Sequence, residues 1–183
     1  MNREIGGEFW LTNRPAGHIS SCPDWIEVWG NNILTSSGSG ALSLMLKQVE
    51  DKVLSKTVLL PAYTCESVIL PFVKEGYTCY FYDVDENLKP NLKSIEKYLK
   101  ERIGIFLHMG YYGLPTNIDL EDTVKKLKNN KVIIAEDVTH TLFSKYKRFE
   151  ENDYYIASLR KWLGIPSGGF LIFKESKIQT KLN

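Results

Sequence analysis

The stretch VIIAED, residues 132–137, has four apolar residues followed by two acids. Similar apolar runs recur along the chain in TVLLP (57–61), TCYFYDVD (78–85), IGIFLHM (103–109), DYYIASL (153–159) and GGFLIFK (168–174). Runs that are apolar on both faces are typical of strands buried between helices. Segments with helical spacing of apolar residues separate them, at 37–53, 63–76, 92–102 and 118–130. The sequence therefore predicts an α/β fold with three layers, α/β/α, around a mostly parallel central sheet.

Two of the predicted helices carry residues that bear on their ends. Pro71 is expected to kink or shorten the helix at 63–76. Asp119 suits the N-cap of the helix at 118–130, with Glu121 and Asp122 in the first turn and lysines in the last. This distribution of charge complements the helix dipole.

The first residues of the chain follow no clear period and are rich in Gly, Pro, Asn and Trp. We interpret residues 1–35 as an irregular N-terminal arm anchored by aromatic side chains, of which Trp10, Trp25 and Trp29 are examples. Residues 36–174 form the main domain, and residues 175–183 form a polar tail.

Charge and composition exclude several classes of function. The formal net charge of +1 gives no reason to expect binding to nucleic acid or to an anionic membrane. We interpret the basic stretches KKLKNNK (125–131) and SKYKR (144–148) as solvated faces. No run approaches the ~20 apolar residues of a membrane helix. Three cysteines without CxxC spacing, Cys22, Cys65 and Cys79, indicate reduced thiols in a cytoplasmic protein and no metal site.

A glycine-rich turn opens the first predicted helix, in SSGSGAL (36–42). The small residues Gly38, Ser39 and Gly40 would let backbone N–H groups approach an anion, which the helix dipole favours. An ordinary glycine-rich loop, capped by Ser37 or Ser39, explains the same residues equally well.

The acids at the end of VIIAED also admit two interpretations. An acid at a strand end often caps the next helix, but Asp137 could instead bond a protonated ring nitrogen and hold a pyridinium in its cationic form. His140 follows three residues later. It is either a structural histidine or, if Asp137 faces a cofactor ring, a contact to an oxygen substituent of that ring.

A lysine follows the next strand, in SLRKW (158–162), ahead of the pair Gly168-Gly169. A lysine beyond a strand is usually a surface residue, but Lys161 lies within an apolar and aromatic stretch. Partial desolvation would favour its neutral amine, which is the form that attacks an aldehyde. Ser158 could contribute to a phosphate site.

These pieces occur in the order of one family. The chain resembles the DegT/DnrJ/EryC1/StrS family of fold-type I enzymes, which depend on pyridoxal 5'-phosphate (PLP) and are mostly sugar aminotransferases. Each matching stretch alone has modest specificity, whereas their order and spacing together are far more specific. The matching stretches span about residues 36–173 and are SSGSGAL (36–42), LLPAYTCESV (59–68), GYTCYFYDVD (76–85), HMGYYGLPTNID (108–119), IIAEDVTHT (133–141) and SLRKWLGIPSGGFLIF (158–173).

The resemblance implies roles for individual residues. The turn at 38–40 matches the phosphate-binding turn, and Ser158 matches the serine that contacts the phosphate. Asp137 matches the partner of the pyridine nitrogen. His140 occupies a position that is a glutamine near the phenolic oxygen in many relatives. Lys161 matches the lysine that holds PLP as a Schiff base, and so is the expected catalytic residue.

Two residue patterns depart from the family. Ser158 and Lys161 are three residues apart, whereas many members have a longer Ser-Phe-His…Lys spacing, which leaves the subfamily and substrate open. Cys65, an expected cofactor contact, stands where relatives often place an aromatic residue that stacks on the ring. Tyr63 is the candidate to compensate for it.

The family also differs from this sequence in length. Its members continue into a small C-terminal domain and form homodimers that share active sites. Residues 36–174 therefore correspond to the PLP-binding large domain, without the small domain, and we interpret the chain as a fragment or a truncated gene product.

The resemblance implies a PLP-dependent aminotransferase that moves an amino group from an amino-acid donor to a keto sugar nucleotide, with weak or no turnover by these 183 residues alone. The alternative is a non-catalytic domain of the same fold that retains cofactor binding only. Related sugar dehydratases carry histidine in place of the lysine, so Lys161 argues against dehydration. An unrelated nucleotide-binding domain leaves the lysine segment and the acids at 136–137 unexplained.

Overall fold

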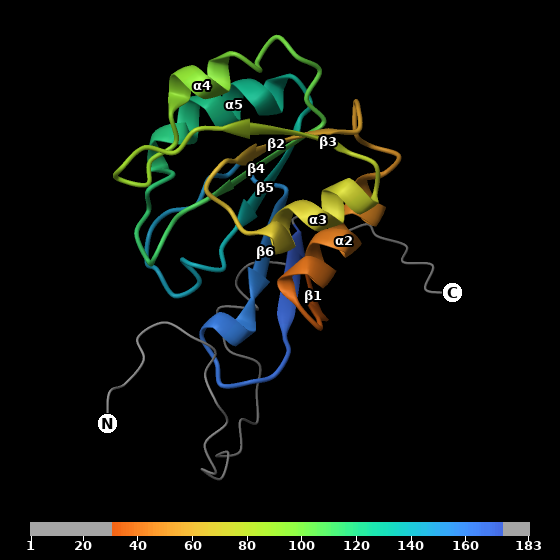
Figure 1. Ribbon diagram of the computed structural model, residues 1–183, viewed down its shortest axis with the longest axis vertical. Helices are drawn as coiled ribbons and strands as arrows, with labels where there is room; N and C mark the ends of the chain where they lie inside the picture. Colours follow the sequence, from red (N-terminus) through yellow and green to blue (C-terminus); the bar gives the residue numbers. More distant parts are fainter. Residues whose placement is uncertain (1–30, 174–183) are drawn as a thin grey trace.

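Seven strands form one sheet in the part of the chain that the structure describes, residues 31–173 of a computed structural model (Figure 1). The strands are β1 Asn31–Thr35, β2 Thr57–Pro61, β3 Thr78–Tyr82, β4 Ile105–Met109, β5 Ile133–Asp137, β6 Tyr154–Ser158 and β7 Gly169–Phe173. The helical elements are α2 Gly38–Val49, α3 Glu66–Lys74, α4 Leu92–Glu96, α5 Glu121–Asn129 and the 3-10 turns η1 Ile118–Leu120 and η2 Leu159–Lys161. Cys22, the three tryptophans predicted as anchors and the polar tail lie outside the described residues.

The predicted mostly parallel sheet is confirmed. Its strand order is β1-β7-β6-β5-β4-β2-β3. The five strands from β6 to β3 run parallel to their neighbours, and β7 runs antiparallel between β6 and β1. Because the parallel strands all end at one edge, the residues that follow them are brought together there.

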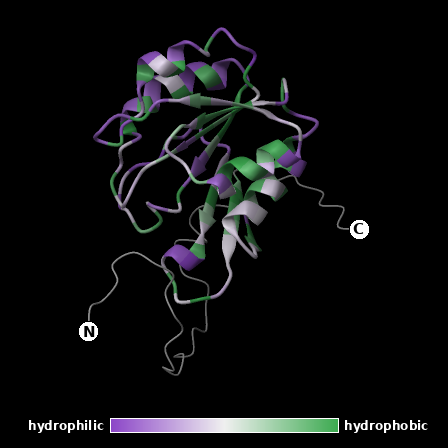
Figure 2. Ribbon diagram, viewed as in Figure 1, coloured by the Kyte–Doolittle hydropathy of each residue, from purple (hydrophilic) through white to green (hydrophobic). Residues whose placement is uncertain are grey.

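Helices cover both faces of the sheet, as Figure 1 shows, so the three layers are also confirmed. Val58 and Leu60 pack in the cluster that contains α2 and α3, whereas Leu59 between them packs with α4 and α5. Full burial of such a side chain contributes about 1.5–3 kcal/mol. Figure 2 shows apolar residues along the strands and hydrophilic residues over much of α4 and α5. Among the described helices, none is long and apolar enough to cross a membrane.

The sequence missed one strand. Residues 31–35, which we placed in the arm, form β1. This strand pairs antiparallel with β7, with Thr35 opposite Gly169. An edge strand has one neighbour and can expose its polar residues. The two asparagines at the start of β1 therefore carry no apolar signal, and the irregular segment cannot extend to residue 35.

Two predicted helix features were also wrong or incomplete. Asp119 does not cap α5: it lies in η1 and pairs with Lys89 at 2.8 Å, while Leu120 occupies the N-cap. The helix predicted at 63–76 is shorter, as α3, yet it continues through Pro71, which is buried.

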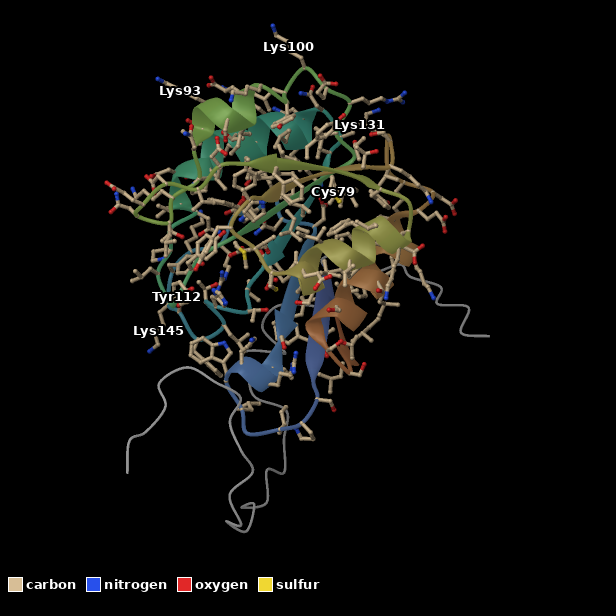
Figure 3. The ribbon with its side chains drawn as sticks, viewed as in Figure 1. Cys79, Lys93, Lys100, Tyr112, Lys131 and Lys145 are labelled. Atoms are coloured by element: carbon tan, nitrogen blue, oxygen red, sulfur yellow. The ribbon has the colours of Figure 1, made fainter. Side chains whose placement is uncertain are left out.

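The basic stretches are not solvated throughout. Lys131 and Lys145, one from each stretch, are exposed, and Figure 3 labels both. Arg148, in the stretch 144–148, is instead mostly shielded, with its side chain 10% exposed, and forms an ion pair with the buried Glu136. Its partner lies twelve residues away in a strand, which a count of local charge could not reveal.

The start of β7 lies against the first turn of α2. A Cβ atom at Gly169 would come within 2.7 Å of the Gly38 nitrogen and would overlap the Ser37 carbonyl group. Gly168 donates its N–H to Ser36 O at 2.7 Å and has a φ of +148°, which side chains disfavour. The two glycines therefore allow a closer contact between β7 and α2 than any side chain would permit.

We expect Gly169→Ala to lower the free energy of unfolding by about 1–3 kcal/mol, the usual cost of overpacking, because rigid backbone surrounds the added methyl group. Urea denaturation measures the change. Gly40→Ala is the matched control in the same segment, since its Cβ would meet Ser37 Oγ, Ser36 Oγ and Thr35 Cβ at ordinary contact distances of 3.4, 3.6 and 3.8 Å. Alanine there is expected to be neutral or stabilising by up to ~1 kcal/mol. Equal losses in the two variants would contradict the close contact.

Candidate active site

A cavity of about 380 Å³ opens where the carboxyl ends of the parallel strands meet the N-terminus of α2. Its position is the one expected for ligand sites in such sheets, and its volume suits a small molecule. Seven of the eight residues predicted to bind the cofactor line it, namely Gly38, Ser39, Cys65, Asp137, His140, Ser158 and Lys161. Gly40 does not, because its N–H donates to Ser37 Oγ at 3.0 Å.

The first turn of α2 borders this cavity with backbone N–H groups. Ser37 caps the helix, as one of the two sequence interpretations held, and leaves the N–H groups of Gly38 and Ser39 as the first two of the helix. Such N–H groups have no carbonyl partner within the helix, and they lie at its positive end. Gly38 lies against Ser158. A Cβ atom added at Gly38 would lie 3.3 Å from the Cβ atom of Ser158. Ser39 Oγ donates to Ser67 O at 2.9 Å and ties α2 to α3.

Asp137 ends β5 with its carboxylate facing the cavity. The side chain is 5% exposed, and its Oδ1 accepts the Thr139 N–H at 2.9 Å. Burial raises the pKa of Asp137, and the hydrogen bonds from Thr139 and the nearby His140 offset part of that rise. A cation placed beside this carboxylate would favour its ionised form.

His140 presents a buried nitrogen without a partner. Its ring stacks on Tyr112 with centroids 5.1 Å apart, and its carbonyl accepts the Gly113 N–H at 2.8 Å. Burial lowers the pKa of His140, so the imidazole is neutral near pH 7. Nδ1 has no hydrogen-bond partner among residues 31–173. The described residues therefore leave this nitrogen unsatisfied in a side chain that lines the cavity.

Thr139, which the sequence analysis overlooked, joins the Asp137 turn to the lysine segment. Its Oγ1 accepts the Ser158 N–H at 3.0 Å, and its carbonyl accepts the indole N–H of Trp162. Lys161 ends η2 at the border of the cavity and is exposed. The exposure of this residue gives no support to the partial desolvation considered for its amine, and the Trp162 indole packs edge-on against Phe143.

Tyrosines form one wall of the cavity. Tyr63 Oη lies 3.0 Å from Tyr112 Oη, and Tyr111 donates its hydroxyl to Tyr63 O at 2.7 Å. Cys65 is an exposed free thiol whose Sγ lies 2.9 Å from Ser67 Oγ. The paired aromatics in GYYG (110–113), directly after β4, were a signal that the sequence analysis could have used.

These groups fit PLP by their chemistry. The helix N-terminus suits a phosphate, the buried Asp137 suits a pyridinium, the orphaned His140 Nδ1 suits a ring oxygen, and Lys161 supplies an amine. The fit rests on residues from three separate segments of the chain, namely the first turn of α2, the turn at 137–140 and the segment that ends at Lys161.

The fold belongs to the class formed by the large domains of PLP-dependent transferases. Three solved structures illustrate the match. The aminotransferase TlmJ from Streptoalloteichus hindustanus has a TM-score of 0.70 and 22% identity, with 83% of this chain and 43% of that one covered. PseC from Helicobacter pylori, an aminotransferase involved in pseudoaminic acid biosynthesis, has a TM-score of 0.69 and 16% identity. The match covers 83% of this chain and 44% of PseC. GDP-4-keto-6-deoxymannose-3-dehydratase with bound GDP-perosamine has a TM-score of 0.65 and 18% identity. The match covers 83% of this chain and 44% of the dehydratase.

The family follows from the sequence itself. The profile of the DegT/DnrJ/EryC1/StrS aminotransferase family matches residues 28–162, and the chain belongs to that family. None of the curated proteins matches the sequence. The chain spans less than half the length of the solved structures described above.

We expect Asp137→Asn to leave the cofactor-free protein as stable as the wild type, or more stable, at neutral pH. Because the folded pKa of Asp137 is raised, ionisation there disfavours the folded state. The penalty is absent below about pH 4, where the carboxyl is protonated in both states, and it grows as the pH rises through the folded pKa. Thermal unfolding across this range measures it, with Asp51→Asn on an exposed residue as the control. A lower Tm for Asp137→Asn at neutral pH would contradict the raised pKa.

Proposed function

We propose that this chain binds PLP and forms the cofactor site of an aminotransferase that acts on a keto sugar nucleotide with an amino-acid donor. The observation that carries the proposal is the convergence of three groups on one cavity, namely the N-terminus of α2, Asp137 and Lys161. Membership of a family of PLP-dependent enzymes supports the cofactor.

Each group of the site would have one task. The N–H groups of Gly38 and Ser39 would hold the phosphate together with Ser158. Asp137 would accept the hydrogen bond of a protonated ring nitrogen and so keep that nitrogen charged. His140 Nδ1 would meet the ring oxygen. When bound, PLP supplies an electron-withdrawing ring, which makes a proton on the substrate carbon easier to remove.

Lys161 would carry the covalent attachment and the proton transfer. Its position at the end of a short 3-10 turn lets the amine reach into the cavity or move aside. In its neutral form Nζ would accept the proton that leaves the α-carbon of the amino donor and return it later in the reaction, as a general base and then a general acid. No other lysine lines the cavity among the described residues.

The choice of a sugar nucleotide as acceptor rests on the relatives. One of the similar structures holds GDP-perosamine, and another serves pseudoaminic acid biosynthesis. We further propose that the complete protein is a cytoplasmic homodimer, as the family resemblance implies. The second candidate function is cofactor binding without turnover, and the observation that favours it is Cys65, a thiol where relatives often have an aromatic residue.

We expect the purified protein to take up PLP with a visible absorbance band, and Lys161→Ala to abolish that band. After reduction with borohydride, mass spectrometry should find one pyridoxyl phosphate group on Lys161. Lys145→Ala, at an exposed lysine outside the cavity, is the matched control and should retain the band. Labelling of another lysine would overturn the assignment.

A second assay separates the two candidate functions. Transfer of the amino group from glutamate to a keto sugar nucleotide, lost in Lys161→Ala, would support the aminotransferase. A stable PLP adduct without transfer to any such acceptor would favour the binding-only domain.

A further inference from the structure

Arg148 holds both ends of the turn that carries Asp137 and His140. Its guanidinium forms an ion pair with Glu136, the residue before Asp137, through Nη1. The same group donates to Thr141, the residue after His140, from Nη1 to Oγ1 at 3.1 Å and from Nη2 to O at 2.7 Å. One side chain therefore bridges the turn from outside the cavity, since Arg148 does not line it.

The Glu136 carboxylate is fixed by several donors besides Arg148. It is 1% exposed and accepts hydrogen bonds from Asn152 Nδ2 at 2.8 Å and from Asn117 Nδ2 at 3.4 Å. Both asparagines also bond the ring of the buried His108, at 2.9 Å each. Buried charges that are paired and hydrogen-bonded in this way hold a single geometry.

The arrangement controls the direction of Asp137 through the geometry of the strand. Successive side chains of a strand point to opposite faces. Glu136 is fixed on the face of α4 and α5, so the carboxylate of Asp137 must point toward α2 and the cavity. The bonds from Arg148 to Thr141 fix the other end of the turn, and with it the position of His140.

We propose that Arg148 is a positioning residue for the cofactor site, acting through Glu136 and Thr141 on the Asp137–His140 turn. The inference deepens the proposed function and rests on it for the part that concerns PLP. The part that concerns the turn rests on contacts within the chain and is tested on the cofactor-free protein.

The experiment compares Arg148→Met with Lys128→Met. Lys128 also forms an ion pair beside β5, with Oδ1 of Asp153. Oδ2 of Asp153 accepts the Ile134 N–H, which lies at the end of β5 opposite to Asp137. The control therefore removes a basic partner near the same strand but far from the turn. Two quantities are measured at a temperature where every variant is folded: the dissociation constant for PLP by absorbance titration, and hydrogen exchange of the Thr139 amide in cofactor-free protein.

We expect Arg148→Met to weaken PLP binding by about tenfold or more, the size of effect seen when groups that orient a metal ligand are removed. Exchange of the Thr139 amide, which bonds Asp137 Oδ1, should become faster. Arg148→Lys should restore binding in part, because it keeps the charge but lacks the forked donors. Lys128→Met should lower Tm while leaving both quantities within about twofold of the wild type, a change that lies within 0.5 kcal/mol.

Equal PLP affinity and equal exchange in Arg148→Met and Lys128→Met would overturn the proposal, since Arg148 would then contribute stability alone. If the wild type does not bind PLP, the proposed function fails, and the exchange rates still decide whether Arg148 holds the turn. If Arg148→Met does not fold, Arg148→Lys and Thr141→Val provide the test. Thr141→Val removes one acceptor of the guanidinium and should produce a smaller loss in the same direction.

Discussion

The start of β7 lies so close to the first turn of α2 that only glycine fits between them. Gly169 pairs with Ser158 on β6 and with Thr35 on β1, so the close contact fixes three strands relative to one helix. Because the lysine segment continues directly from β6, it must emerge beside the N-terminus of α2. The distance between the N-terminus of α2 and the segment that carries Lys161 is therefore a consequence of backbone packing, and it does not depend on a side-chain interaction that could relax.

The two adjacent acids at the end of β5 have opposite environments. Glu136 is paired with Arg148 and surrounded by donors on one face of the sheet, whereas Asp137 faces the cavity with Thr139 as its backbone donor. Burial raises the pKa of Asp137, and the hydrogen bonds from Thr139 and the nearby His140 offset only part of that rise. Glu136 thus serves the structure of the turn, whereas the buried Asp137, which faces the cavity, is the acid to which the proposed function gives ligand recognition.

The sequence predicted the parts of this arrangement that depend on local pattern. Apolar runs revealed six of the strands, and the rule that ligands bind at strand ends pointed to Asp137 and Lys161 before any coordinates. The polar β1 was missed because an edge strand needs no apolar face. Thr139 and Arg148 were missed for another reason. Their importance lies in partners on other strands or turns, and a threonine or an arginine in a polar stretch has no local signature of such contacts.

Cys65 shows how these features act together. A thiol offers no aromatic face, so a ring in this cavity would be held mainly by groups at its edge, which are the N-terminus of α2, Asp137 and His140. Polar contacts hold a ring well only if their directions are fixed in advance. Contacts outside the cavity hold each of these groups. The glycines of β7 pack against the first turn of α2, and Arg148 bonds the turn that carries Asp137 and His140. Because Cys65 offers no ring to stack on, the position of a bound ring would depend more on the contacts that hold these three groups in place than on the lining of the cavity itself.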